Sequence, residues 1–224
     1  MKDYISTLLF EFKANANLKI AAQQKAYLRE QFTFYGIKTP ARRAIQKPFL
    51  IKAHLPPKKN LEGLVRTLWN KPQRECHYFA QELVQKYRKQ FDVKDIVLLE
   101  YMIENNSWWD TVDFIATKPI KAYFKKFPNQ RDVYIEKWLS SGNIWLQRTC
   151  LIFQLLEKEK TDAILLKHVI SSLLGSHEFF INKAIGWALR DYGKTNPEWV
   201  MNFVESSDLH PLSKREALKL MNYL

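Results

Sequence analysis

Apolar residues recur along the chain with the spacing of an α-helix. In the segment 61–69, Leu61, Leu64, Val65 and Leu68 fall at positions i, i+3, i+4 and i+7, so they share one helical face. Strand patterns are scarce, because no alternating apolar and polar run ends in an Asn-Gly or Asp-Gly turn and the chain has only 6 glycines. The pattern predicts an all-α protein of about a dozen helices.

Aromatic residues begin successive predicted helices at a nearly constant spacing. Trp109 and Trp145 are 36 residues apart, and Trp145 and Phe180 are 35 apart, which is typical of paired-helix repeats of the HEAT kind. A two-helix unit cannot bury its own apolar face, so neighbouring units must stack, and a small rotation between them gives a curved solenoid. No linker or low-complexity tract interrupts the sequence. We therefore expect residues 1–224 to form a single HEAT-like solenoid domain with a concave basic groove.

The charge of the chain indicates an anionic partner. Its 224 residues include 35 Lys and Arg against 23 Asp and Glu, which gives a formal net charge of +12 and favours polyanions. Many soluble proteins are basic, so the placement of the charges matters more than their number. Cationic side chains recur near predicted helix starts, where free N–H groups also favour phosphate. These residues are Arg42, Arg43, Lys47, Arg74, Arg148, Lys183 and Arg215.

Several classes of protein find no support in the sequence. Cys76 and Cys150 are the only cysteines, and neither they nor the five histidines have the spacing of a disulfide framework or a metal site. No phosphate-binding loop, dinucleotide-binding glycine motif or nucleophile elbow occurs. The N-terminus is unlike a signal peptide, and no apolar run approaches the length of a membrane span. We expect a cytoplasmic protein that uses no metal, cofactor or membrane.

The segment NNSWWDTVDFIA (105–116) is the first candidate site. Trp109 and Asp113 are four residues apart and share a helical face. If Trp108 points to the core, Trp109 lies about 100° further round the helix, at the edge of the groove with Asp113 above it. In the alternative interpretation, which spacing alone favours, both tryptophans are core residues and Asp113 is solvated or stabilises the helix dipole. Arg148, one repeat later, is a second candidate whose alternative is an ordinary surface arginine.

A third cluster lies in INKAIGWALRDYG (181–193). Lys183, Trp187 and either Arg190 or Asp191 fall on one side of the predicted helix. The preceding Gly186 lets another backbone or a ligand come close, although a core tryptophan is the commoner explanation for Trp187. The cluster is therefore a candidate on position rather than on residue type alone.

Four segments together resemble the AlkD-like DNA glycosylases. They are YGIKTPARRAIQK (35–47), NNSWWDTVDFIA, the Gln-Arg of WLQRTC (145–150) and KAIGWALRDYGK (183–194), in the same order as in the family. The match runs from about residue 5 to the C-terminus. It implies a HEAT-like solenoid that holds duplex DNA in a concave basic groove and hydrolyses the N-glycosidic bond of N3-alkyladenine and N7-alkylguanine.

The resemblance also implies a role for individual residues. Asp113 matches the catalytic carboxylate, and Trp109 and Trp187 match the aromatic residues of the groove. Arg148 matches the phosphate-facing arginine, and Tyr27 matches its aromatic partner. The candidate catalytic set is Asp113, Trp109, Trp187 and Arg148, and the candidate DNA contacts are Tyr27, Arg42, Arg43, Lys47, Arg74, Lys183, Arg190 and Arg215.

This set suits cleavage of a cationic leaving group. Breaking a glycosidic bond builds positive charge on the deoxyribose, which a carboxylate such as Asp113 stabilises while it orients water. An N3- or N7-alkylated purine already carries positive charge and departs neutral, so no general acid is required. Neither Glu nor His accompanies Asp113 at a spacing that suggests one. We therefore predict base excision of alkylated purines from double-stranded DNA by a monomer without a cofactor.

A non-catalytic HEAT-repeat module is the competing hypothesis. Such a module would bind nucleic acid or an acidic protein through the same basic groove, and it accounts for the fold and the charge equally well. It does not account for Asp113, because an anion-binding groove gains nothing from an aspartate in its middle.

Overall fold

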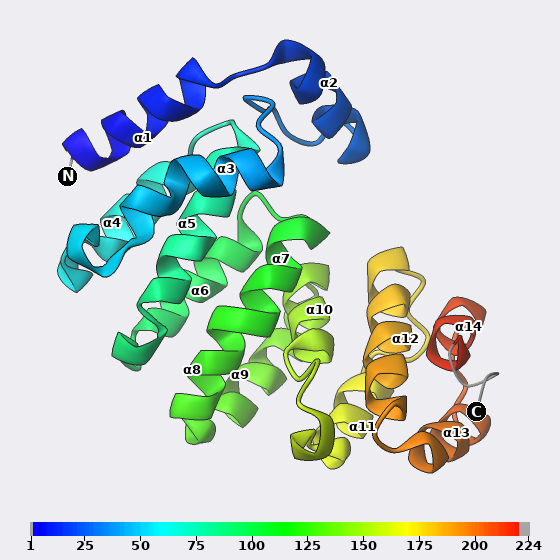
Figure 1. Ribbon diagram of the computed structural model, residues 1–224. Coiled ribbons are helices and arrows are strands. Elements are labelled where there is room, and N and C mark those ends of the chain that lie inside the picture. The colour runs from blue at the N-terminus through cyan, green and yellow to red at the C-terminus, as the bar shows by residue number, and fades with distance from the viewer. Residues whose placement is uncertain (1, 220–224) are drawn as a thin grey trace. The chain divides into compact units, whose positions relative to one another are not determined.

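The computed structural model describes residues 2–219, and Figure 1 shows that they are predominantly helical. Within these residues no strand forms, and one isolated parallel bridge joins Thr33 and Gln73. The predicted all-α class is confirmed. No helix in the described range is both long and apolar enough to span a membrane. The chain forms two compact units, Met1–Asp92 and Val93–Leu224; that they act together as one domain remains a prediction.

The first unit contains five α-helices in its described part. They are α1 (Lys2–Ala14), α2 (Leu18–Tyr27), α3 (Thr39–Gln46), α4 (Leu61–Trp69) and α5 (Arg74–Lys86). The predicted apolar face of α4 is buried and packs against α5. Three short 3₁₀ turns between 47 and 60 connect α3 to α4. They coincide with the proline-rich stretch of the sequence, which cannot continue a regular helix.

A buried carboxylate fixes the loop before α3. Glu75 is fully buried at the start of α5 and accepts hydrogen bonds from the backbone N–H groups of Tyr35, Gly36 and Ile37 at 3.0–3.2 Å. Gly36 has a φ of +88°, and a Cβ there would lie 2.0 Å from the carbonyl oxygen of Asn17. Only glycine tolerates both conditions, so this residue lets the loop turn against α2.

The second unit contains nine α-helices in the part that the structure describes. They are α6 (Asp95–Glu104), α7 (Trp109–Ile115), α8 (Lys121–Lys126), α9 (Pro128–Leu139), α10 (Ile144–Ile152), α11 (Ala163–Ser171), α12 (Phe179–Gly193), α13 (Pro197–Ser206) and α14 (Pro211–Leu218). The helices α7, α10, α12 and α14 contact one another in series. The aromatic residues Trp109, Trp145 and Phe180 all lie in the first turn of a helix of this row, so the predicted helical repeat is confirmed.

The helices α7 and α8 form one continuous run through a π-helical segment, η5 (Ala116–Ile120), which contains Pro119. A proline in a helix interior removes one backbone donor and crowds the preceding turn. A local π-turn accommodates this change without ending the helix. Residues from Trp109 to Lys126 therefore belong to one continuous helical segment.

A glycine allows α12 and α14 to approach closely. A Cβ at Gly186 would lie 2.4 Å from the Cβ of Glu216 and 2.9 Å from the carbonyl oxygen of Ser213. Of the two explanations that the sequence left for this glycine, close approach of another backbone is the observed one. The helix contact places Glu216 beside the cationic side chains of α12.

Candidate active site

The centre of the candidate site is an ion pair between α7 and α10. The Nε and Nη2 groups of Arg148 donate to the two carboxylate oxygens of Asp113, at 2.7 and 2.9 Å. Arg148 is 5% exposed, and the Asp113 side chain retains 18% exposure. Bidentate pairs of this kind fix the orientation of both groups. Asp113 is thus held in a fixed orientation and remains partly exposed, and Arg148 is not the surface arginine of the alternative interpretation.

The third arm of the Arg148 guanidinium reaches α12. Its Nη1 donates to the carbonyl oxygen of Phe180 at 2.7 Å. The Phe180 ring belongs to an aromatic cluster with Trp108 and Trp145, in which ring centroids are 5.0–5.7 Å apart. Arg148 therefore links three successive helices of the row, and it uses donors on all three of its nitrogens to do so. Its geometry favours a role in positioning Asp113 over the predicted phosphate contact.

The electrostatics of Asp113 follow from its burial and its neighbours. Burial raises the pKa of the Asp113 carboxyl above its ordinary value, and the charge of Asp110 raises it further. The hydrogen bonds and the positive charge of Arg148 oppose this rise. Because desolvation disfavours the charged form of a carboxyl, the ionised state of Asp113 depends on Arg148.

Trp108, the residue before α7, and Trp109, the first residue of α7, are both half-buried but have different surroundings. Trp108 packs in the aromatic cluster, and its buried indole N–H has no hydrogen-bond partner. Trp109 is half-buried and lies one turn before Asp113. Trp187 is half-buried as well, two turns after Phe180 on α12. Neither Trp109 nor Trp187 is therefore a core tryptophan.

The predicted cationic cluster of α12 binds a carboxylate of α14. Lys183 Nζ lies 3.1 Å from Glu216 Oε1, and Arg190 Nη1 lies 2.8 Å from Oε2. Asp191, the other residue that helical spacing allowed, accepts from the backbone N–H of Leu156 instead. Lys183 and Arg190 retain part of their exposure, 37% and 22%, so both stay candidates for DNA contact.

Two predicted DNA contacts in the first unit are buried. Arg42 is 4% exposed and donates to Gln46 and Glu82 at 2.8 and 3.0 Å. Arg74 is fully buried, hydrogen-bonds to His77 at 3.0 Å and lies over the ring of Phe32. Neither guanidinium is accessible to a phosphate in this structure. The prediction failed to distinguish a buried arginine near a helix start from an exposed one, because both occupy the same position relative to the start of the helix.

The remaining predicted contacts are exposed. Arg43 and Lys47 line a cleft of about 530 Å³ between the end of α3 and α5, together with Lys52 and Lys86. Arg215 and Tyr27 are also exposed, the latter to 72%. Tyr27 ends α2, and Arg215 lies in the last turn of α14 and not near the start of a helix, where the sequence had placed it. These residues remain candidates for contact with DNA, and the cleft has the positive charge that a phosphate would require.

The structure adds residues that sequence reasoning overlooked. Phe180 was used to define the repeat, yet its carbonyl oxygen binds Arg148. Glu216 was not singled out, although it binds both cations of α12. No sequence pattern marks either contact, because one is a backbone atom and the other joins two helices more than 25 residues apart. Among the described residues, no group of three or more His, Cys, Asp or Glu side chains could hold a metal ion.

Solved structures show which proteins this architecture is similar to. A predicted DNA alkylation repair enzyme from Enterococcus faecalis has 33% identity, with 93% of this chain and 98% of that chain covered and a TM-score of 0.87. AlkD2 from Streptococcus mutans has 16% identity, 91% and 98% coverage and a TM-score of 0.64. The smu.31 protein of S. mutans UA159 has 16% identity, 93% and 98% coverage and a TM-score of 0.62. No curated protein sequence matches the chain.

The row of packed helices therefore defines a helical-repeat protein of the AlkD type. The family model described as DNA alkylation repair enzyme matches residues 8–221. The chain belongs to this family of DNA alkylation repair enzymes.

Proposed function

We propose that the protein is a DNA glycosylase that removes cationic alkylated purines, N3-alkyladenine and N7-alkylguanine, from duplex DNA. The observation that carries the proposal is the Asp113 carboxylate, which is held by the Nε and Nη2 groups of Arg148 and is still partly exposed. A preorganised carboxylate stabilises positive charge that develops on a sugar without any reorganisation during the reaction. Asp113 has this role in the proposal, and it also orients the attacking water.

The half-buried tryptophans supply the second element. Trp109 lies one turn before Asp113 on the same helix, and Trp187 lies on the helix whose Phe180 binds Arg148. An aromatic face attracts a cation by about 0.5–2 kcal/mol, depending on how far the site is desolvated. In the proposal these two rings lie against the cationic lesion and sugar.

The exposed cations supply contacts to the DNA backbone. Arg43, Lys47, Lys183, Arg190 and Arg215 retain access to solvent, and phosphate contacts fix register without reading sequence. We propose that they bind the duplex while the carboxylate acts, in the cytoplasm, as a monomer and as the first step of base excision repair.

The competing proposal is that the protein binds nucleic acid or an acidic protein without catalysis. The ion pair strengthens this alternative in one respect, since Arg148 neutralises the Asp113 charge that would otherwise repel an anion. It leaves one fact unexplained. A purely structural pair does not account for the half-buried Trp109, which lies one turn before Asp113 on the same helix.

Substitution of Asp113 by asparagine separates the two proposals. Asp113→Asn keeps the shape but removes the charge, so excision of N7-methylguanine should fall by about 10²–10³-fold while duplex affinity changes little. Single-turnover excision and a binding titration on the same duplex measure both quantities. A parallel loss of activity and affinity would assign Asp113 to binding, and absence of excision by the wild-type protein would favour the non-catalytic module.

A neutral lesion provides the matched control. N3-methyladenine and N7-methylguanine leave without protonation, whereas hypoxanthine and ethenoadenine need an acid. We expect far slower release of the neutral bases, and activity on the cationic ones should survive EDTA. Comparable rates on both classes would reveal a general acid, for which Asp110, beside Asp113, is the first candidate. Loss of activity in EDTA would reveal a metal site.

A further inference from the structure

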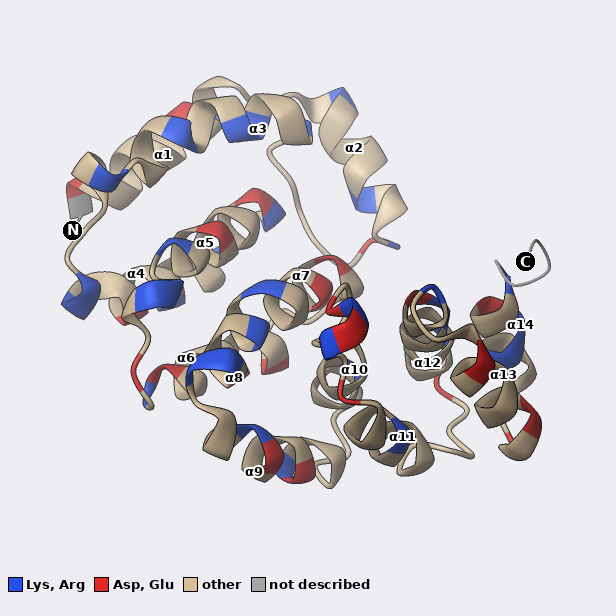
Figure 2. Ribbon diagram, turned by 60° about the horizontal axis from the view of Figure 1, so that its bottom comes forward, with Lys and Arg blue, Asp and Glu red and all other residues tan. Residues whose placement is uncertain are grey.

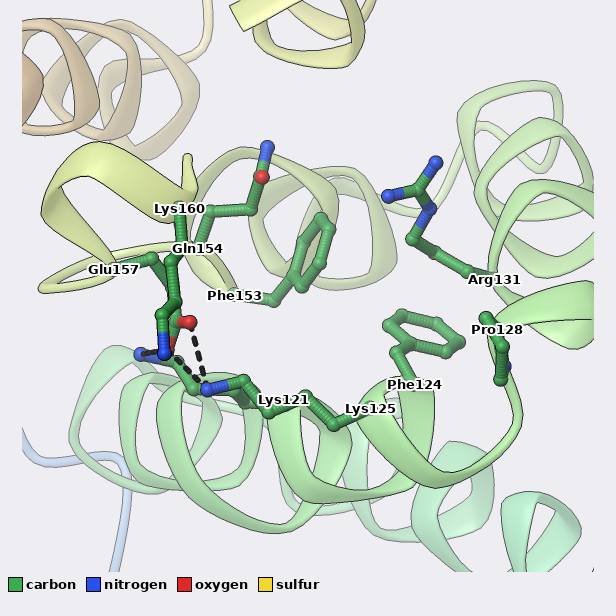
Figure 3. A pocket seen from close by; sticks show the side chains of 9 residues that line it. All are labelled: Lys121, Phe124, Lys125, Pro128, Arg131, Phe153, Gln154, Glu157 and Lys160. Carbon is green, nitrogen blue, oxygen red and sulfur yellow. Dashed lines mark hydrogen bonds and ion pairs between the residues drawn. The ribbon is translucent and has the colours of Figure 1, made fainter. Parts of the chain in front are cut away.

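A cavity of about 230 Å³ lies in the second unit, between α8, α9 and the connection from α10 to α11. Figure 3 shows four cationic side chains around it, Lys121, Lys125, Arg131 and Lys160. Among the residues that line the cavity, Lys121 is the one on the α7–α8 run that is nearest to Asp113. It lies eight residues after Asp113, or about 12 Å along the helix axis. The cavity is therefore separate from the candidate active site.

The floor of the cavity is apolar. The rings of Phe124 and Phe153 meet edge to face with centroids 5.3 Å apart, and the two residues are 3% and 5% exposed. Both rings project between Arg131 on one side and Lys121 and Lys125 on the other (Figure 3). An apolar floor reduces local screening, so charges at the rim act more strongly on an ion in the cavity.

One wall carries two lysines and a single carboxylate. Glu157 binds Lys121 at 3.1 Å and Lys125 at 2.7 Å, and Lys121 also donates to the carbonyl oxygen of Leu155. Burial alone would raise the pKa of Glu157, but the two ammonium groups lower it below its ordinary value. Glu157 is therefore ionised at neutral pH and holds both lysines at the wall, yet its charge offsets only one of them.

The opposite wall is oriented by carboxylates outside the cavity lining. Arg131 lies 2.7 Å from Asp132 and 3.2 Å from Asp162, which fix its guanidinium and offset its charge.

Lys160 is exposed and comes from the 3₁₀ turn η6 (Lys158–Lys160). In Figure 2 the connection from α10 to α11 shows both blue and red segments, and α8 is blue near its end. The excess positive charge at the cavity thus comes from lysines of two separate elements.

We propose that this cavity binds a phosphate group. A compact anion with acceptors in several directions matches cationic side chains that line the cavity from α8, α9 and η6. The apolar floor would accommodate the uncharged part of the ligand. The phosphate could come from a free nucleotide or from the backbone of a DNA strand, and both present the same chemistry. This proposal does not depend on excision by Asp113.

Deoxyadenosine monophosphate and undamaged duplex DNA are the two probes. Lys125→Gln combined with Lys160→Gln removes two exposed charges without disturbing the core, and Lys59→Gln combined with Lys167→Gln is the matched control at exposed lysines elsewhere. Calorimetry at low salt should show nucleotide affinity falling at least about 10-fold in the cavity variant and hardly at all in the control. If the ligand is a phosphate of the DNA backbone, the slope of log K for duplex binding against log salt concentration should instead decrease in magnitude by up to about 2.

The two readouts identify the source and can overturn the proposal. Loss of nucleotide binding alone assigns the cavity to a free phosphate ester, and a lower slope assigns it to DNA. If both readouts of the cavity variant equal those of the control, the proposal is wrong. Excision at saturating duplex should be the same in both variants, so a failure here differs from a failure of the Asp113 proposal.

Discussion

In the described part of each unit, a buried arginine pairs with a partly exposed carboxylate. Arg42 is 4% exposed and Arg148 is 5% exposed, and their partners Glu82 and Asp113 retain 17% and 18% of side-chain exposure. In both cases the partner lies 35 to 40 residues away in the sequence. Similar burial and similar separation nevertheless produce two different environments for the carboxylate.

The difference lies in what completes each pair. Gln46 joins the first pair, because it accepts from Arg42 and donates to the second oxygen of Glu82. Arg148 instead binds both oxygens of Asp113 itself and extends its remaining arm to a backbone carbonyl. The first arrangement is a side-chain network that ties α3 to α5. The second holds a single carboxylate in place beside Trp109, which suits chemistry.

The largest expected effect comes from Arg148→Ala. Without the guanidinium, burial raises the pKa of Asp113 further, so the carboxylate is protonated at higher pH. Excision near neutral pH should fall by about 10²–10³-fold. The acid limb of the rate profile should also move to higher pH, because activity requires the ionised form. Single-turnover rates over a series of pH values measure both changes.

Two further measurements distinguish positioning from phosphate contact. Arg148→Lys keeps the charge but cannot form the bidentate pair, so its loss of activity should be intermediate. The salt slope of duplex binding should be unchanged in Arg148→Ala, whereas a lost phosphate contact would reduce it by about 1. If the salt slope is reduced and the acid limb of the rate profile does not shift, Arg148 contacts a phosphate, as the sequence suggested.

Removal of Arg42 should affect stability and not chemistry. Arg42→Ala leaves Glu82 partly buried without its main cation, which typically costs about 3–5 kcal/mol in the free energy of unfolding. Denaturant unfolding measures this loss, and excision per folded molecule should remain at the wild-type level. Arg43→Ala is the control one residue away, where 65% exposure predicts a change within about 0.5 kcal/mol. Equal effects of the two substitutions would contradict the network.

The smallest expected effect concerns acid stability. Hydrogen bonds from Lys183 and then Arg190 lower the pKa of Glu216 below its ordinary value, which is about 4.3 in an unfolded chain. The stabilisation is therefore present above that pH and is lost as the pH falls through the folded pKa. Because Lys183 is 37% exposed, solvent limits the effect to under about 1 kcal/mol.

Glu216→Gln tests this assignment. The variant should be slightly less stable at neutral pH and should equal the wild-type protein in strong acid, where the carboxyl is protonated in both states. Thermal unfolding at several pH values provides the comparison. A constant difference at all pH values would show that Glu216 acts through packing against Gly186 and not through its charge.

The sequence by itself determined the helical class, the repeat and the helices that carry the candidate site. Periodic apolar residues such as those of α4 have one buried face in any packing, and the aromatic spacing places Trp109, Trp145 and Phe180 at the starts of three helices. These features are local or repeat at a fixed period. They are therefore visible without the tertiary structure.

Only the tertiary structure decided which charges meet. Arg42, Arg74 and Arg148 all lie near helix starts, and nothing local marks them as buried; their partners come from the same turn in one case and from helices 35 to 40 residues away in the others. The sequence placed Asp113 and Arg148 one repeat apart but could not pair them, because a salt bridge depends on how adjacent helices pack and on the desolvation that packing imposes.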